Sequence, residues 1–427
     1  MFKRFITIFA LCAGVLALSS GACQKDSGLS IPAPPTPSGG GGGETTGGGG
    51  ETPGGEDDAV LCTDIGQTPI VLAYYTENSP ALPDVSLLTH INYAHGRFVD
   101  KENGDGGIYI EAPTSNPNLF RDVIALKSRN PRLKVMLMIG GWGDKADGFS
   151  MMARDATKRK TFCTSVKGLL DTYGFDGVDI DWEYPTQTAG GVNGASPDDT
   201  QNFNLVLKEL RETLGTSKII SYASSSSASY VDWPTAMKYL DYVNVMTYDM
   251  GAAPHGHNSP LYRSGNFAHR SCDESIQAHF NKGIPYNRMN LGVPFYGKSE
   301  KEQDETKRET PKIYPYEVKY NQMAKVLAGT FSYTYKGTDG QNKTVYSADY
   351  NIRKWDPIAR VPYLVDKANH IMLSYDDPES VDLKGKYAIG NGLLGAMCWE
   401  YRHDDDNQSL LKALVKAMYG KESVLDE

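Results

Sequence analysis

Acidic side chains recur at short, regular spacing in the segment Phe175-Asp-Gly-Val-Asp-Ile-Asp-Trp-Glu-Tyr-Pro185. The segment has the apolar, β-branched character of a buried strand, and side chains alternate between the two faces of a strand. Asp179, Asp181 and Glu183 therefore share one face. Carboxylates held this close raise one another's pKa, and a carboxyl group with a raised pKa can serve as a general acid near neutral pH.

A solvated strand face and a calcium-binding loop are the two non-catalytic interpretations of these acids. The flanking residues are those of a buried parallel strand, which disfavours an exposed face. A calcium loop of this type needs Gly at its sixth position and Glu at its twelfth, and neither fits. Asp176, at the start of the strand, is interpreted as a structural turn residue. The spacing therefore favours a functional acid row.

The elements that must position these acids alternate between short apolar runs and longer segments of helical period, which predicts βα units and a parallel sheet. Helical periodicity is clear over 158–173 and 202–214. Eight strand candidates predict an α/β fold, a (β/α)8 TIM barrel, whose active site forms at the carboxyl ends of the strands. The candidates are 70–75, 90–95, 134–139, 177–183, 219–223, 242–248, 290–295 and 393–399.

Polar residues follow the predicted strands where a barrel enzyme needs them: Tyr248 and Asp249 end the sixth strand, and Trp399 ends the eighth. The connection between the seventh and eighth strands is too long for one loop. Its excess, 299–369, contains alternating segments suited to a small antiparallel sheet, so we expect an α+β insertion there. The barrel is expected to span 65–420, followed by a C-terminal tail over 421–427.

The acid row, written Asp176-x-x-Asp179-x-Asp181-x-Glu183, resembles the signature of glycoside hydrolase family 18, the chitinase family. The resemblance extends from Ile70 to about Asp405, and the insertion resembles the extra domain of one branch of that family. Further matching motifs are Tyr74-Tyr75, Thr89-His-Ile-Asn-Tyr-Ala94, Gly140-Gly-Trp142, Met246-Thr-Tyr-Asp249, Gly292-Val-Pro-Phe-Tyr-Gly297 and Ala396-Met-Cys-Trp-Glu400.

The resemblance implies a retaining glycosidase that cleaves β-1,4-linked N-acetylglucosamine polymers such as chitin, with the substrate's own 2-acetamido oxygen as the nucleophile. Glu183 would be the general acid and base. Asp181 would hold the acetamido group, Asp179 would share a proton with Asp181, and Tyr248 would donate to the acetamido oxygen. The implied substrate-binding residues are Trp399, Trp142, Asp249, Met246, Tyr184 and Tyr74.

Three positions depart from the family pattern. Met138 stands where the third strand usually carries Ser, Lys298 stands where an Arg frequently follows the seventh strand, and His95 replaces the aromatic residue of the second strand. None of these touches the acid row, so we expect altered sugar affinity before lost chemistry. His257, on the loop after the sixth strand, could line the site or be an ordinary loop residue.

Two other functions fit the same residues. One is an endo-β-N-acetylglucosaminidase that cuts N-linked glycans, and the other is a non-catalytic sugar-binding lectin. The predicted insertion favours a deep chitin cleft over the first function. The second is disfavoured because such lectins lack the acid that this chain retains as Glu183.

The N-terminal residues predict an exported lipoprotein. Residues 1–22 have the basic start, apolar run and small-residue end of a signal peptide, and Cys23 resembles the lipid-bearing first residue of a bacterial lipoprotein. Residues 23–58 continue as a Gly- and Pro-rich linker without a fold of its own. We expect the protein at the outer membrane or cell surface, held to the membrane by the N-terminal lipid.

Composition limits the other partners. The net charge of −9 without a long basic run argues against nucleic acid as a ligand. The sequence contains no phosphate-binding Gly loop and no metal-ligand spacing, so we expect no cofactor and no metal. Cys62, Cys163, Cys272 and Cys398 leave their pairing open, although Cys163 and Cys398 lie in apolar segments typical of buried thiols. We expect a monomer.

Overall fold

The computed structural model describes residues 59–78, 81–188, 192–265, 270–300 and 312–425. The predicted signal peptide over 1–22, the lipid-bearing Cys23 and the linker over 23–58 lie outside the described residues. Among the helices that are described, none is both long and apolar enough to cross a membrane.

Eight parallel strands form a closed barrel, because β1 pairs with both β2 and β16. This confirms the (β/α)8 prediction, including the order of the strands. Three strands end earlier than expected: β5 stops before Glu183, β7 stops before Tyr248 and β8 stops before Phe295. Glu183 and Tyr248 therefore stand on loops that leave the barrel. The strands are β1 Ile70–Thr76, β2 His90–Phe98, β4 Lys134–Gly141, β5 Gly177–Trp182, β6 Ile219–Ser225, β7 Tyr242–Met246, β8 Met289–Pro294 and β16 Gly395–Trp399.

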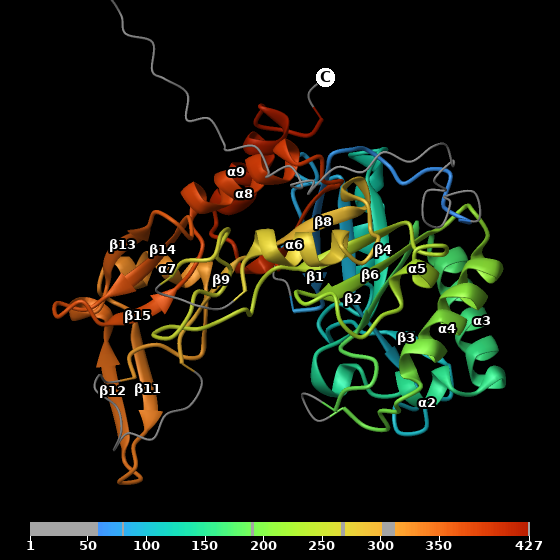
Figure 1. Cartoon of the computed structure of the whole chain (residues 1–427), viewed down its shortest axis with the longest axis horizontal. Helices are drawn as coiled ribbons and strands as arrows, with labels where there is room; N and C mark the ends of the chain where they lie inside the picture. Colours follow the sequence, from blue (N-terminus) through green and yellow to red (C-terminus); the bar gives the residue numbers. More distant parts are fainter. Residues whose placement is uncertain (1–58, 79–80, 189–191, 266–269, 301–311, 426–427) are drawn as a thin grey trace, which may run out of the picture. The chain divides into compact units, whose positions relative to one another are not determined.

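Helices cover the outside of the barrel, with α2, α3 and α4 along one side (Figure 1). Helix α3 begins where Asp155 accepts hydrogen bonds from the backbone N–H groups of Thr157 and Lys158, and it ends at Gly174, whose φ of 85° is left-handed. The short strand β3, Ile108–Ile110, pairs antiparallel with β2. The helices are α1 Leu119–Ala125, α2 Phe149–Ala153, α3 Ala156–Tyr173, α4 Asp199–Leu214, α5 Trp233–Ala236, α6 Cys272–Phe280, α8 Pro378–Gly390 and α9 Ser409–Tyr419.

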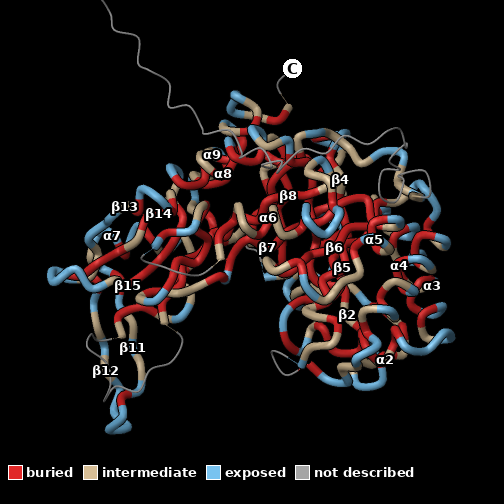
Figure 2. The backbone as a smooth tube through the Cα atoms, viewed as in Figure 1, coloured by how far each residue is buried: buried red, intermediate tan, exposed pale blue. Residues whose placement is uncertain are grey.

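The alternation along β5 divides its side chains between two environments. Val178, Ile180 and Trp182 are buried among the apolar side chains between strands and helices, where Trp182 stacks on Phe149 with ring centroids 5.3 Å apart. The intervening Asp179 and Asp181 face the barrel interior and are also buried. The eight barrel strands are buried along almost their whole length, and the exposed positions around the barrel lie mainly on its outer helices and loops (Figure 2). The predicted shared face of the acids is confirmed for this strand.

An inserted α+β region lies between β8 and α8. Five strands form an antiparallel sheet in the order β10-β9-β15-β14-β13, and β11 and β12 form a separate hairpin that extends beyond it (Figure 1). The elements are β9 Tyr296–Lys298, β10 Glu317–Lys319, α7 Met323–Leu327, β11 Ser332–Lys336, β12 Asn342–Tyr346, β13 Ile352–Asp356, β14 Val361–Val365 and β15 Ile371–Ser374.

His257 joins the loop after β7 to this inserted sheet. Its ring is fully buried, with Nδ1 3.1 Å from Ser374 Oγ and Nε2 3.3 Å from Asp356 Oδ2. It therefore has structural partners and is not among the residues that line the pocket described below.

The C-terminal segment and the cysteines also have defined places. Val424 is buried, and its backbone N–H donates to the carbonyl of Ser86, so the segment after α9 packs against the barrel. The cysteines at 62, 163, 272 and 398 are all free thiols. Cys163 and Cys398 are buried, as the apolar character of their segments predicted.

Candidate active site

A pocket of about 560 Å³ opens at the carboxyl ends of the barrel strands. Nine of the ten residues that the sequence singled out for catalysis or substrate binding line it. The tenth, Asp179, lies beneath the pocket on the same face of β5. The nine are Tyr74, Trp142, Asp181, Glu183, Tyr184, Met246, Tyr248, Asp249 and Trp399.

Asp179 is the deepest acid of the row and is fully partnered. Its carboxylate accepts hydrogen bonds from the Tyr74 hydroxyl at 2.8 Å, from Ser221 Oγ at 2.6 Å and from Asn244 Nδ2 at 3.0 Å. Burial raises its pKa to about 6, although these hydrogen bonds oppose the rise. Met138 lies opposite Asp179 in the β4–β5 register and has no hydroxyl to offer it. The hydroxyl groups that donate to Asp179 come instead from Tyr74 on β1 and Ser221 on β6.

Asp181 and Glu183 stand above Asp179, toward the pocket. Burial, followed by the charges of Glu183 and Asp179, raises the pKa of Asp181 well above its usual range. One carboxylate oxygen of Asp181, Oδ1, is buried without a hydrogen-bond partner among the described residues. Burial also raises the pKa of Glu183, to about 7. A carboxyl group with this pKa can both give and take a proton near neutral pH.

Aromatic rings surround the acids. Trp399 lies against Tyr74, with ring centroids 5.5 Å apart, and Tyr184 stacks on Tyr230 at 5.1 Å. Trp142 follows β4 at the rim of the pocket and is 55% exposed, the highest exposure among the large apolar side chains that line it. Such flat faces suit the apolar faces of sugar rings.

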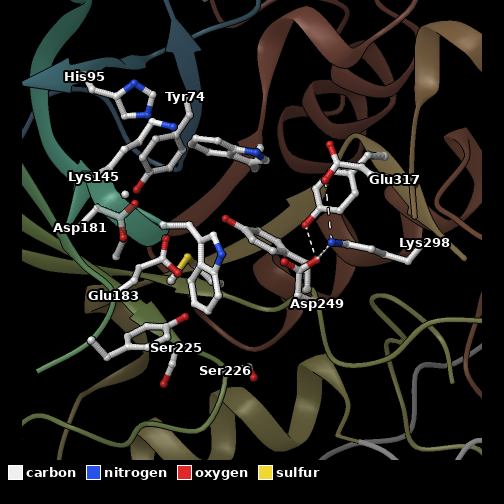
Figure 3. A pocket seen from close by; sticks show the side chains of 18 of the residues that line it. Tyr74, His95, Lys145, Asp181, Glu183, Ser225, Ser226, Asp249, Lys298 and Glu317 are labelled. Atoms are coloured by element: carbon white, nitrogen blue, oxygen red, sulfur yellow. Dashed lines mark hydrogen bonds and ion pairs between the residues drawn. The ribbon is translucent and has the colours of Figure 1, made fainter. Parts of the chain in front are cut away.

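The other side of the pocket is polar and includes the insertion (Figure 3). Lys298 Nζ lies 3.1 Å from Asp249 Oδ1 and 3.8 Å from Glu317 Oε2. The Tyr296 hydroxyl donates to the same Asp249 oxygen at 2.6 Å, and the Lys298 ammonium lies 4.0 Å from the centre of the Tyr316 ring. Lys298, which replaces the family's frequent Arg, is thus already occupied by protein partners.

Some pocket residues were not predicted from the sequence. Tyr316 and Glu317 come from the insertion, and Lys145 comes from the 3-10 turn Gly143–Lys145 after β4. The motif Gly140-Gly-Trp142 marked where β4 ends, but not the direction of the turn that follows. Ser221 and Asn244, the partners of Asp179, sit at inward positions of β6 and β7 and carried only the signal of a polar residue within an apolar run.

Glu77, His95 and Glu111 are the one group of potential metal ligands that the described residues bring together, with ligand atoms within 4.8 Å of one another. His95 Nδ1 lies 3.2 Å from Glu77 Oε2, and Arg97 Nη1 lies 3.4 Å from Glu111 Oε2. Arg97 already supplies positive charge to Glu111, and His95 is the partner of Glu77. We therefore describe the group as a hydrogen-bonded cluster beside the pocket, to which His95 contributes a lining side chain.

The chain resembles known proteins over most of its length. It is 35% identical to "Chitinase A1" of Niallia circulans over 67% of this chain and 43% of that protein, and 27% identical to "Chitinase ChiA" of Flavobacterium johnsoniae over 78% and 27%. The chain therefore spans less than half the length of these two relatives. Mouse "Chitotriosidase-1" is 29% identical over 75% of this chain and 68% of that protein.

Solved structures of similar proteins superpose on most of this chain. The Ostrinia furnacalis Group IV chitinase superposes with a TM-score of 0.67 at 27% identity, covering 82% of this chain and 99% of that one. A family 18 N-acetylglucosaminidase from Paenibacillus barengoltzii superposes with a TM-score of 0.65 at 28% identity, with the same coverage. The sequence profile of the glycosyl hydrolases family 18 matches residues 70–404, which include the whole acid row and the insertion. The chain belongs to glycosyl hydrolases family 18.

Proposed function

We propose that this protein is a retaining glycoside hydrolase that cleaves β-1,4-linked N-acetylglucosamine polymers, chitin and chitooligosaccharides, through an oxazolinium intermediate. The observation that carries the proposal is the acid row, in which Glu183 opens into the pocket above two further buried carboxyl groups. Family membership and relatives named as chitinases support it.

In the first step, Glu183 gives its proton to the glycosidic oxygen as the bond from that oxygen to the anomeric carbon breaks. The substrate's acetamido oxygen forms the new bond to the anomeric carbon, which gives a cyclic oxazolinium ion and a free leaving sugar. Asp181 accepts a hydrogen bond from the acetamido N–H and stabilises the positive charge that develops on this ring. Its unpartnered Oδ1 offers an acceptor for that purpose.

In the second step, Glu183, now ionised, takes a proton from water, and the resulting hydroxide attacks the anomeric carbon from the side that the leaving sugar vacated. The oxazolinium ring opens, and the product keeps the configuration of the substrate. Asp179 holds the proton that it shares with Asp181, and Tyr248 donates to the acetamido oxygen. Trp399 stacks beneath the reacting sugar, and Trp142 offers its exposed ring to the next one.

The remaining lining residues complete the sugar site. Tyr74 holds Asp179 through its hydroxyl and supports the ring of Trp399. Asp249, held by Tyr296 and Lys298, presents a carboxylate to sugar hydroxyl groups. Met246 and Tyr184 also line the pocket.

Replacement of the proposed acid tests this function. Glu183→Gln should lower kcat on chitotetraose by at least about a hundredfold, because general acid catalysis contributes roughly 10²–10⁴ in rate, and the variant should still bind the oligosaccharide in calorimetry. Glu212→Gln, at an exposed Glu on α4, is the matched control and should keep full turnover. Wild-type turnover by Glu183→Gln would remove Glu183 from its role.

The substrate class is tested by comparing chitooligosaccharides with an intact N-glycosylated protein. We expect cleavage of the chitooligosaccharides alone, because Tyr316 and Glu317 of the insertion line the pocket and lengthen the wall available to a linear sugar chain. Release of whole N-glycans would assign an endo-β-N-acetylglucosaminidase instead. Binding of chitin without any hydrolysis would assign a lectin.

We also propose that the enzyme is exported, lipidated at Cys23 and displayed at the outer membrane or cell surface. The signal-like residues 1–22 and the Gly- and Pro-rich residues 23–58 support this localisation. Labelling of growing cells with a radioactive fatty acid tests it: the wild type should be labelled and Cys23→Ala should not. An unlabelled wild type would remove the lipid from the proposal.

A further inference from the structure

Two lysines line the pocket and differ in their partners. Lys298 is buried and lies beside Asp249 and Glu317. Lys145 lies on the other side of the pocket, where Figure 3 shows it beside His95 and Asp181. Of these two lysines, only Lys145 acts electrostatically on both Asp181 and Glu183.

The end of β4 leaves room for the Lys145 side chain at the wall of the pocket. Strand β4 ends in Gly140 and Gly141, both at left-handed φ values, 108° and 122°. A Cβ added to Gly141 would lie 2.9 Å from Lys145 Cδ, closer than such atoms approach in folded proteins. The glycine therefore leaves the room in which the aliphatic part of Lys145 crosses the end of the strand.

The neighbouring residue of the turn points to the outer surface. Asp144 Oδ2 lies 2.9 Å from Lys101 Nζ and 3.3 Å from Arg97 Nη2, so the turn is held from outside by two cations. With Asp144 fixed outward, Lys145 carries the charge of the same turn to the pocket side. This arrangement places one ammonium at the wall beside an acid row that has no cation in direct contact among the described residues.

The charge of Lys145 opposes the effect of burial. Burial raises the pKa values of Asp181 and Glu183, and Lys145 lowers both. Lys145 also lowers the pKa of Glu77 at the end of β1. The titratable and charged groups that face the row and its lysine from the surrounding elements are Tyr74, Glu77, His95, Asp179, Tyr184, Tyr222, Tyr248 and Asp249.

We propose that Lys145 is a positioning residue of the active site, whose ammonium stabilises the state in which Asp181 and Glu183 share a single proton and so sets the pH range of catalysis. This inference rests on the proposed function, because the singly protonated pair is the form that the first step uses. Loss of the cation disfavours each ionisation of the row. The pair then gives up its first and second protons at higher pH.

The test is the pH dependence of kcat/KM on chitotetraose. Lys145→Met should move both the acid and the alkaline limb to higher pH by about 0.5 to 1 unit, since a nearby opposite charge lowers a carboxyl pKa by roughly 1 to 3 units at closest approach. Lys145→Arg keeps the charge and should restore both limbs. Lys167→Met removes the same charge from an exposed pair on α3 and should leave both limbs in place.

A second measurement separates this inference from the proposed function. Carboxyl ¹³C titration by NMR follows the acids without substrate, and Lys145→Met should raise the midpoints of the row by the same amount even if the wild type does not cleave chitotetraose. Unshifted midpoints in Lys145→Met would overturn the inference. Uniform loss of activity with both limbs in place would also overturn it, because it would indicate a role in binding or folding.

Discussion

Asp376 and Asp181 are both fully buried acids of this barrel protein, but their surroundings differ. Lys384 Nζ lies 2.7 Å from each carboxylate oxygen of Asp376, and Ser380 Oγ donates to Oδ1 at 2.7 Å. The lysine also donates to Ser259 Oγ. Every strong donor and acceptor of this pair is therefore used, as expected of a buried ion pair that is retained for structure.

Asp241, directly before β7, repeats the pattern. Arg211 Nη2 donates to Asp241 Oδ2 at 2.7 Å, and both side chains are 1% exposed. The backbone N–H of Ile220 donates to the same oxygen at 2.7 Å, and that of Cys62 donates to Oδ1 at 2.5 Å. This pair fastens the N-terminal end of the described chain to the barrel.

The acid row has the opposite surroundings. Asp181 lies between two further carboxyl groups, and one of its oxygens has no hydrogen-bond partner in the described part of the chain. Burying like charges without a cation in contact costs stability, because each ionised group disfavours ionisation of the next. Asp376 and Asp241 thus stabilise the fold through their ion pairs, whereas burial of the acid row lowers the stability of the fold.

Breaking a structural pair should produce the largest change in stability. Lys384→Met leaves Asp376 buried without its cation, and we expect the free energy of unfolding at pH 7 to fall by about 3 to 5 kcal/mol, measured by urea denaturation. Lys386→Met, which removes an exposed partner of Asp382 on the same helix, should change stability little. Equal losses in the two variants would contradict the distinction.

Neutralising an acid of the row should raise the free energy of unfolding rather than lower it. Burial raises the pKa of Glu183 from 4.5 to about 7, so its contribution to stability is present below pH 4.5 and is lost as pH rises through 7. Glu183→Gln should therefore be more stable than the wild type at pH 8 by about 1 to 3 kcal/mol, with the difference fading near pH 4.

Asp376→Asn is the matched variant in the structural pair. It also replaces a buried carboxyl by an amide, but it leaves the buried Lys384 without an anionic partner. The variant should therefore be less stable than the wild type at pH 8. Thermal unfolding of both variants at pH 4 and pH 8 measures the contrast. A loss of stability in Glu183→Gln at pH 8 would show that Glu183 is held as a structural acid.

The positions of the inward-facing acids and of the pocket could largely be predicted from the sequence. Alternation along 177–183 placed Asp179 and Asp181 on the inner face, and the polar residues after the strands marked the end of the barrel where the pocket opens. These features follow from a period of two and from the parallel arrangement, both of which are local. The roles of the individual side chains stay predictions until variants are assayed.

Other parts of the site depend on contacts that no local pattern encodes. Lys145 reaches the pocket from a short 3-10 turn that follows Gly141, and Glu317 comes from an insertion whose sheet is ordered by long-range pairing. The bond from Asn244 to Asp179 requires the register of two intervening strand pairs. The sequence left open whether His257 lines the site or is an ordinary loop residue, and its partners Ser374 and Asp356 lie in the inserted sheet.

The smallest expected effect concerns the acid that shares features of both groups. Asp179 is buried like Asp181 but fully hydrogen bonded like Asp376. Tyr74→Phe removes one donor to it, and since that bond lowers the pKa of Asp179 from what burial alone would give, the pKa should rise above its value of about 6. We expect a rise of about half a unit, with less than tenfold loss of kcat.

Tyr75→Phe is the matched control, because the Tyr75 hydroxyl donates to the carbonyl of Ala81 and belongs to the outer core. Carboxyl ¹³C titration of both variants measures the shift. If the midpoint of Asp179 stays in place in Tyr74→Phe, the hydrogen bond from Tyr74 does not govern its ionisation. If the midpoints of Asp179 and Asp181 both shift by the same amount in Tyr74→Phe, the two acids titrate as one unit. Asp179 then belongs with the acids that share a proton.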